Sequence, residues 1–296
     1  MKKALCLLLA LLLPLSGCAA GAEEITIAAS FYPVYVLAEN VLNGVTGVRV
    51  VCMTAPSTGC LHDYQLLTGD MRTLAGAGAL LINGAGMEGF LPDVAAQLPQ
   101  LPIIDCSQGI ALIEEEETED HQGHSHGEAN AHIWLAPKNA IQMVRNMAAA
   151  LQALLPQAAE QIGANAEAYI GRLEALDAEL AAAISALPHK DIVTFHEAFP
   201  YFAEAYGLRV VAVVALEPEE PLSPRLLAEV VDQVHAAGNP PLFSEPQYEN
   251  AAVRAVSQET GAPVFELDPL VTGDGALTAY EDVMRRNLKV LQEALK

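Results

Sequence analysis

The sequence predicts an α/β protein of two lobes with mostly parallel sheets, joined by one long rigid helix. Two observations carry this prediction. Short apolar strands alternate with helical segments in both halves of the chain, which is the order that parallel sheets require. Between the halves, apolar residues recur over 156–187 at spacings that place them on one face of a long helix.

The first half contains the elements of one lobe, which we assign to residues 18–137. Buried strands alternate with helices, and the first helix begins near Pro33 and runs through Val41. Strands are predicted over 25–30, 48–53, 79–83 and 103–105, and two further helices over 70–77 and 90–97.

Residues 114–131 interrupt this pattern with an acidic run that shows no apolar periodicity, which predicts a mobile loop. The loop carries three closely spaced histidines, His121, His124 and His126. Such a tract is typical of weak metal collection, and a solvated charge run is the alternative interpretation.

A helical segment follows over 138–189. One helix is predicted over 139–154, and Pro156 opens a second one that ends at Leu187, before Pro188. At 1.5 Å per residue this linking helix measures roughly 48 Å, enough to run along two lobes and limit motion between them.

The second half, residues 190–296, repeats the alternation of the first and predicts the second lobe. Strands are predicted over 191–195, 210–215, 242–244 and 264–267, and helices over 224–237, 251–260 and 280–295.

The first 17 residues read as a signal peptide. Lys2 and Lys3 precede an apolar run over 4–15 that is too short to span a bilayer of about 30 Å. The ending Leu15-Ser16-Gly17-Cys18 resembles a bacterial lipobox, which implies cleavage before Cys18 and a lipid on its thiol. The alternative is an ordinary secretory signal. We therefore expect an exported protein, anchored to the outer face of the cell membrane or held in the periplasm.

Charge and cysteines narrow the possible partners. The chain has 15 Lys and Arg against 37 Asp and Glu, a formal net charge of −22, which argues against nucleic-acid binding and suits a protein that attracts cations. Cys52 and Cys60 bracket a short loop, and whether they form a disulfide or remain thiols is left open.

Four candidate metal ligands are spread at nearly even intervals, each beside a predicted strand–helix unit: His62, His132, His196 and Asp268. We expect His132 and His196 to follow or join strands, and Asp268 to end one. Three neutral imidazoles and one carboxylate make a closed tetrahedral set for Zn²⁺. Because ligands in open α/β sheets gather at the carboxyl ends of strands, we expect the site in the cleft between the lobes. Glu197 is either a hydrogen-bond acceptor for an imidazole or an acid at a helix start.

Five short motifs, in this order, resemble the metal-binding lipoproteins of bacterial ABC importers for zinc and manganese, specifically the zinc type. They are His62-Asp63-Tyr64, His132-Ile133-Trp134-Leu135, Phe195-His196-Glu197-Ala198-Phe199, Ser244-Glu245-Pro246-Gln247 and Leu267-Asp268-Pro269-Leu270. The resemblance covers residues 18 to 296. It implies two α/β lobes joined by a long helix, metal ligation by the three histidines and often a carboxylate at position 268, transported Zn²⁺, a membrane permease as partner, and a monomer. Leu61, Gln65-Leu66 and Asn130-Ala131 depart from the prolines and acids that the family often has there.

Competing functions remain open from the sequence. A manganese-preferring protein of the same class would favour more carboxylate ligands than three histidines supply. A zinc hydrolase would need an open metal position and a general base, and neither an H-E-x-x-H nor a G-x-S-x-G motif occurs. A surface adhesin with a structural metal would unfold when the metal is removed.

Overall fold

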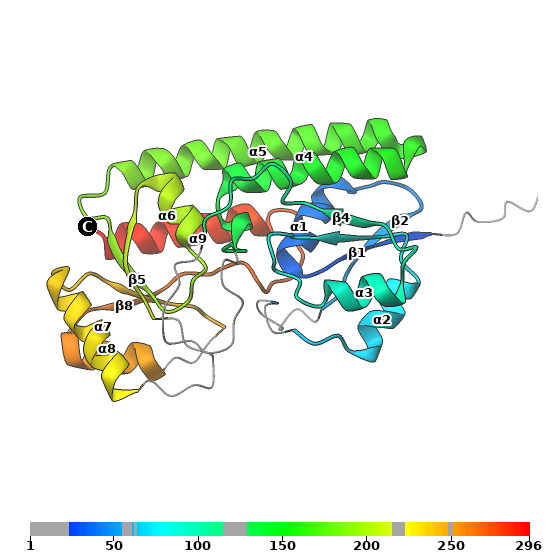
Figure 1. The fold of residues 1–296 in the computed structure, drawn as a ribbon. Helices are drawn as coiled ribbons and strands as arrows, with labels where there is room; N and C mark the ends of the chain where they lie inside the picture. Colours follow the sequence, from blue (N-terminus) through cyan, green and yellow to red (C-terminus); the bar gives the residue numbers. More distant parts are fainter. Residues whose placement is uncertain (1–23, 55–60, 62–63, 115–128, 215–222, 248–250) are drawn as a thin grey trace, which may run out of the picture.

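The computed structural model describes residues 24–54, 61, 64–114, 129–214, 223–247 and 251–296. Two α/β lobes lie side by side beneath a pair of long packed helices, and the C-terminal helix runs below that pair (Figure 1). The predicted fold class is confirmed, since each lobe contains one sheet of parallel strands.

The N-terminal lobe has a four-stranded parallel sheet in the order β2-β1-β3-β4. Its central strands are almost wholly buried, which explains their near-continuous apolar sequence. The strands are β1 (Ile25–Ala29), β2 (Val48–Cys52), β3 (Ala79–Ile82) and β4 (Ile103–Asp105), and the helices are α1 (Tyr32–Val41), α2 (Thr68–Ala75) and α3 (Leu91–Gln97).

The C-terminal lobe repeats this arrangement with a parallel sheet in the order β6-β5-β7-β8. In each lobe, successive strands are added first to one side of the first strand and then to its other side, next to the third strand. Open α/β sheets bind ligands outside the carboxyl ends of the strands at such a switch point. The strands are β5 (Asp191–Thr194), β6 (Arg209–Val213), β7 (Leu242–Ser244) and β8 (Val264–Glu266), and the helices are α6 (Pro200–Tyr206), α7 (Pro224–Ala236) and α8 (Ala251–Thr260).

Helix α6 was not expected from the sequence, although both of its ends carry a signal. Pro200 occupies the first turn, where its missing N–H costs nothing, and Gly207 ends the helix in the left-handed region with φ of 67°. At seven residues the helix is too short to show a clear apolar period.

The linking helix begins later than predicted. Helix α4 (Pro137–Leu154) is followed by a 3-10 turn, η2 (Pro156–Ala158), before α5 (Ala159–Ser185) begins. Pro156 opens this turn at a position where its missing N–H costs nothing, and 3-10 turns are frequent at the ends of α-helices. The 27 residues of α5 measure roughly 40 Å.

One continuous hydrophobic core extends from the N-terminal lobe through the long helices into the inner side of the C-terminal lobe. It includes Leu37 of α1, Leu173 of α5, Phe202 of α6 and Tyr280 of α9 (Ala279–Ala294). A second, smaller core around Val193, Val234 and Val256 lies within the C-terminal lobe. Pulling the lobes apart would expose the shared core to water, which opposes large hinge motion.

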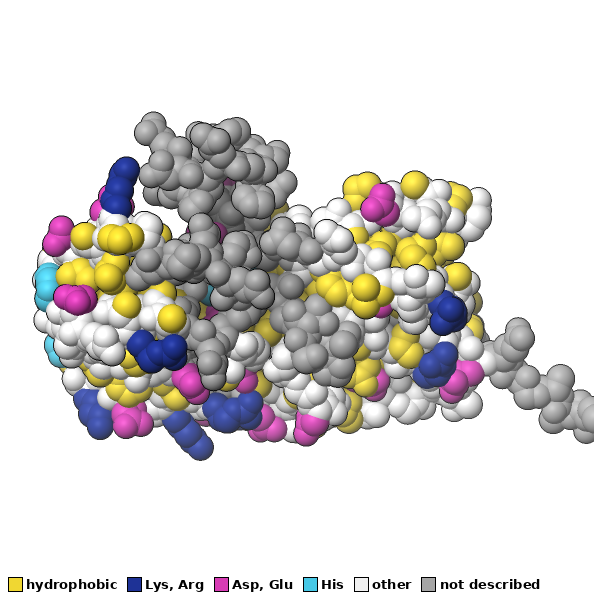
Figure 2. Space-filling view, turned by 90° about the horizontal axis from the view of Figure 1, so that it is seen from below, with side chains coloured by type: hydrophobic (Ala, Val, Ile, Leu, Met, Phe, Trp, Pro, Cys, Tyr) yellow, Lys and Arg dark blue, Asp and Glu magenta, His cyan; other side chains and the backbone are white. Residues whose placement is uncertain are grey.

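The surface carries charges of both signs. On the face shown in Figure 2, basic side chains of the C-terminal lobe are interspersed with acidic ones. No helix in the described part of the chain is both long and apolar enough to cross a membrane.

A buried carboxylate occupies the carboxyl-end crevice of the N-terminal sheet. Glu88, 5% exposed, accepts hydrogen bonds from the Ser30 hydroxyl at 2.7 Å and from the backbone N–H groups of Asn83 and Gly84 at 2.7 and 3.1 Å. Ser30 directly follows β1 and Asn83 directly follows β3, so Glu88 ties together the ends of both central strands. Burial raises the pKa of Glu88 to about 7, although its three donors favour the charged form.

The raised pKa of Glu88 makes stability depend on pH. In the unfolded chain the pKa returns to its ordinary value of 4.5, so between about pH 4.5 and 7 the folded state binds more protons. The stabilising contribution is fully present below about pH 4.5 and is lost as pH rises through about 7, amounting to roughly 3 kcal/mol. We expect the melting temperature of the wild type minus that of Glu88→Gln to fall between pH 5 and pH 8, measured by circular dichroism. A difference that does not change with pH would contradict the raised pKa.

Candidate metal site

His132 lies at the start of a 3-10 helix, η1 (Ile133–Leu135), and the expectation that it follows or joins a strand is wrong. The three residues of η1 are completely buried, so the chain turns here to place them in the core. His132 itself is 1% exposed. The expected loop over 114–131 also ends earlier, because Ala129 forms an antiparallel bridge with Glu114, and Asn130 and Ala131 are buried.

Asn130 holds the imidazole of His132. Its side-chain oxygen accepts the backbone N–H of His132 at 3.0 Å and contacts Nδ1 of the ring at 3.3 Å. The amide of Asn130 donates to the backbone carbonyl of Glu197 in the C-terminal lobe at 2.8 Å. The hydroxyl of Tyr201 in α6 donates to the carbonyl of Asn130 at 2.7 Å. Asn130 therefore fixes His132 relative to the opposite lobe.

His196 lies two residues after β5, at the carboxyl end of the C-terminal sheet. Its ring meets that of His132 edge to face, with centroids 4.7 Å apart and planes at 88°. The structure thus brings together two of the predicted ligands, one from each lobe.

The carboxylate that holds His196 belongs to Glu245. Its Oε1 lies 2.7 Å from Nδ1 of His196, and the residue is 6% exposed directly after β7. Glu197 was expected either in this role or as an acid at a helix start, and the contact with Nδ1 of His196 shown here is made by Glu245. Glu245 is correctly placed because β5 and β7 are neighbours in the sheet, so their carboxyl ends lie side by side.

Both imidazoles are oriented by their Nδ1 contacts. Because the oxygens of Asn130 and Glu245 are acceptors, each Nδ1 carries the proton and donates, an assignment made from the hydrogen-bond network. When such a ring is neutral, its lone pair lies on Nε2, which is the form in which histidine binds a metal.

Asp268 follows β8 by two residues in a strained turn. Asn287 of α9 clamps its backbone on both sides, accepting from its N–H at 2.9 Å and donating to its carbonyl at 2.8 Å. Leu270, fully buried, adopts φ of 60°, a left-handed conformation that L side chains other than Asn and Asp rarely take. Such strain persists only where surrounding contacts enforce it.

The Asp268 side chain has three protein partners. Oδ1 accepts the N–H of Leu270 at 2.9 Å and the amide of Gln247 at 3.4 Å, and Oδ2 lies 3.5 Å from the guanidinium of Arg286. Within the described ranges, no group of three or more His, Cys, Asp or Glu side chains is arranged to hold a metal ion. The pair of His132 and His196 is therefore assembled, whereas Asp268 is engaged with other groups.

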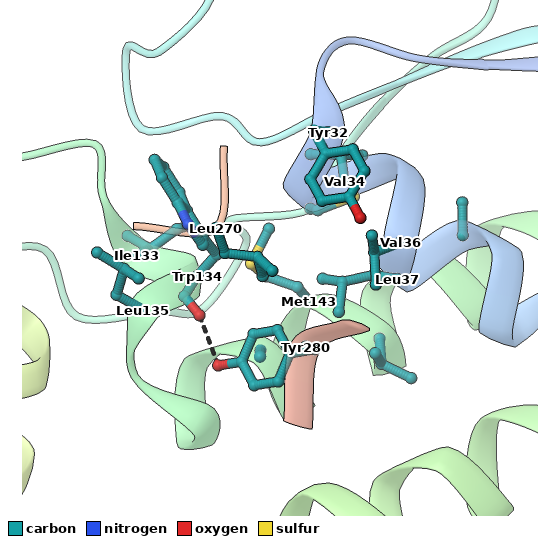
Figure 3. Close-up of a cluster of buried hydrophobic side chains, with 14 of the residues drawn as sticks. Tyr32, Val34, Val36, Leu37, Ile133, Trp134, Leu135, Met143, Leu270 and Tyr280 are labelled. Atoms are coloured by element: carbon teal, nitrogen blue, oxygen red, sulfur yellow. Dashed lines mark hydrogen bonds between the residues drawn. The ribbon is translucent and has the colours of Figure 1, made fainter. Parts of the chain in front are cut away.

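Trp134 connects the histidine pair to the Asp268 turn. Its indole N–H donates to the carbonyl of Pro269 at 2.8 Å, and its ring lies 5.2 Å from that of His132. The hydroxyl of Tyr280 donates to the Trp134 carbonyl at 2.7 Å, the dashed line of Figure 3, with Leu270 packed beside the indole. Trp134 thus links two candidate ligands from different lobes, His132 and Asp268.

Two buried oxygens beside these residues fit a cation. Oε2 of Glu245 and Oε1 of Gln247 have no hydrogen-bond partner within the described part of the chain. A buried acceptor without a donor costs free energy, which a bound cation or its water would offset. The residues present therefore suit a positively charged ligand.

Several predicted residues lie outside the described ranges: His62, the loop histidines His121, His124 and His126, the lipobox Cys18, and Cys60. Among the described residues Cys52 has no disulfide partner, and its pairing with Cys60 lies outside them.

Sequence reasoning missed Glu245, the function of Asn130 and the clamp by Asn287. For Glu245 a signal was available, since Ser244-Glu245-Pro246-Gln247 directly follows a predicted strand, where a ligand-facing acid is expected. Asn287 lies in the middle of a helix and carries no comparable signal.

Comparison with known proteins finds similarity to zinc-uptake and other metal-binding proteins. The family model of ZnuA, zinc-uptake complex component A, periplasmic, matches residues 27–294. The zinc-binding lipoprotein AdcA of Streptococcus pneumoniae is 30% identical over 282 residues, which cover 91% of this chain and 56% of AdcA. The chain thus spans little more than half the length of that relative. A crystal structure of ZnuA matches with a TM-score of 0.79 at 27% identity, covering 92% of this chain and 100% of the other. The Mn²⁺ complex of FpvC from Pseudomonas aeruginosa matches with a TM-score of 0.82 at 27% identity, covering 92% and 98%.

The Tyr280 hydroxyl provides a test of the contact between the lobes. Tyr280→Phe leaves the buried carbonyl of Trp134 without its donor, and we expect a loss of about 1–2 kcal/mol in the free energy of unfolding in urea. Tyr169→Phe is the matched control, because the equally buried hydroxyl of Tyr169 has no hydrogen-bond partner among the described residues. The control should lose no stability, because it removes a buried hydroxyl that has no hydrogen-bond partner to leave behind. Equal losses in the two variants would contradict the role of Tyr280.

Proposed function

The chain belongs to the ZnuA family of periplasmic zinc-uptake components, and we propose that it captures Zn²⁺ outside the cytoplasm and delivers it to the permease of an ABC importer. The observation that carries this proposal is the pair of His132 and His196, supplied by opposite lobes and held through Nδ1 by Asn130 and Glu245. Such a pair would supply two of the four ligands of a metal site, already oriented by their hydrogen-bond partners.

The proposed ligand set is His62, His132, His196 and Asp268. Three imidazoles and a carboxylate suit the tetrahedral preference of Zn²⁺, whereas Mn²⁺ favours more oxygen ligands, so manganese is not the favoured cargo. Binding requires neutral imidazoles, so protons compete with the metal and acid favours release.

Capture and delivery have a structural basis in the placement of the ligands. Since the ligands come from both lobes, a metal ion bound between them is held less tightly when any one of them withdraws, without unfolding either lobe. We further propose that a lipid on Cys18 tethers the monomeric protein outside the membrane. His121, His124 and His126 would collect zinc near the site, as histidine-rich tracts do.

The two alternative functions, a zinc hydrolase and a metal-stabilised adhesin, explain fewer of these observations. A hydrolase would need a general base beside an open metal position, and in our proposal Asp268 closes the coordination sphere. A metal-stabilised adhesin would depend on the metal for folding. The continuous core across both lobes instead supports a protein that is folded without metal.

Zinc binding by metal-stripped mature protein tests the proposal. We expect one tight Zn²⁺ site that Mn²⁺ does not fill in competition, and a loss of affinity of more than about 100-fold for His62→Ala, His132→Ala or His196→Ala. This exceeds the 10- to 100-fold typical when only a supporting partner is lost. Competition with a chromophoric chelator measures the affinity, and the single tryptophan, Trp134, reports binding by fluorescence.

His235→Ala is the control for these variants, since His235 is exposed and its imidazole contacts Asn239. It should bind zinc as the wild type does. Wild-type affinity in all three ligand variants would refute the proposed site, and preference for Mn²⁺ would refute the cargo.

Glu245 should raise zinc affinity through its contact with the imidazole of His196. Glu245→Gln keeps the size of the side chain but removes the charge that makes the His196 imidazole a stronger donor, so we expect zinc binding to weaken about 10- to 100-fold. Glu266→Gln, an exposed residue at the end of β8, should leave the affinity unchanged. Unchanged affinity in Glu245→Gln would mean that the contact with His196 is only structural.

A further inference from the structure

A basic side chain lies against the carboxylate expected to complete the site. Arg286 of α9 places its guanidinium 3.5 Å from Oδ2 of Asp268. The next residue, Asn287, clamps the Asp268 backbone, so helix α9 holds both the main chain and the charge of this residue.

The two oxygens of Asp268 differ in their availability. Oδ1 accepts from Leu270 and Gln247, which together occupy its two lone pairs. Oδ2 contacts Arg286, and no other donor to it is found among the described residues. A metal ion approaching Asp268 would therefore take Oδ2 and meet Arg286 there.

Arg286 is suited to exchange rather than to a permanent ion pair. Its side chain is 60% exposed, and its separation from Oδ2 is at the long end for an ion pair. The neighbouring Arg285 is paired with Glu179 at 2.9 Å, so it does not share this function. An exposed, long pair of this kind is weak and easily broken.

Resting on the zinc-capture function proposed above, we propose that Arg286 competes with the metal ion for the carboxylate of Asp268. The guanidinium pairs with Oδ2 when no metal is bound, which stabilises the metal-free state. As the metal leaves, the guanidinium pairs with Oδ2 again. Arg286 therefore lowers zinc affinity and speeds zinc release, which suits a protein that must hand its cargo on.

The test compares four proteins in metal-stripped mature form: wild type, Arg286→Gln, Asp268→Asn and the double variant. Zinc affinity is measured against a chelator, and the release rate is followed by Trp134 fluorescence after adding excess chelator. Lys289→Gln is the matched control, since it removes one positive charge from an exposed position one turn along the same helix. Melting temperatures confirm that each variant is folded.

We expect Arg286→Gln to bind zinc about two- to fivefold more tightly and to release it more slowly, while Lys289→Gln changes neither by more than about 1.5-fold. In the Asp268→Asn background the gain from Arg286→Gln should disappear. Weaker binding by Arg286→Gln, an unchanged affinity, or an equal gain without the Asp268 carboxylate would each overturn this function of Arg286. A wild-type protein with no tight zinc site would instead refute the zinc-capture function itself.

Discussion

The hydrogen bond from the Trp134 indole to the carbonyl of Pro269 joins the two lobes where their candidate ligands meet. On one side of it Trp134 packs against His132, and on the other Pro269 follows Asp268. Tyr280 fixes the Trp134 backbone, and Trp134 and Tyr280 both lie in the shared core. Because the bond is buried, losing it would leave an unpaired polar group, so the separation of the lobes is tightly set.

The two histidines of the assembled pair have unequal partners, and this has a chemical consequence. A carboxylate draws the Nδ1 proton more strongly than an amide oxygen does, so Glu245 makes His196 the stronger electron donor, whereas Asn130 affects His132 less. Asn130 also has an amide to donate, which an aspartate would lack, and it uses this donor to reach the opposite lobe. His132 is therefore a weaker electron donor than His196, but Asn130 fixes its position relative to the opposite lobe.

In the proposed function, a rigid scaffold leaves metal exchange to movements of local groups. The core across both lobes and the 27-residue helix α5 oppose wide opening. The Asp268 turn is different, since it combines a strained Leu270 with a carboxylate shared among Gln247, Arg286 and the backbone. Exchange of partners at this one carboxylate is a small motion with a large effect on a cation, because electrostatic interactions in a partly buried site are strong.

The sequence by itself determined the elements and their class: apolar periodicity located both sets of strands and most helices, and the order of strand and helix required parallel sheets. It also singled out His132, His196 and Asp268, because residue type and position after apolar runs are local properties. The tertiary structure alone decided which side chains meet. Glu245 reaches His196 because β5 and β7 are neighbours, Asn287 reaches Asp268 from another helix, and Asn130 bridges two lobes. These contacts join residues that are separated along the chain, and local sequence patterns do not show which distant residues meet in the folded protein.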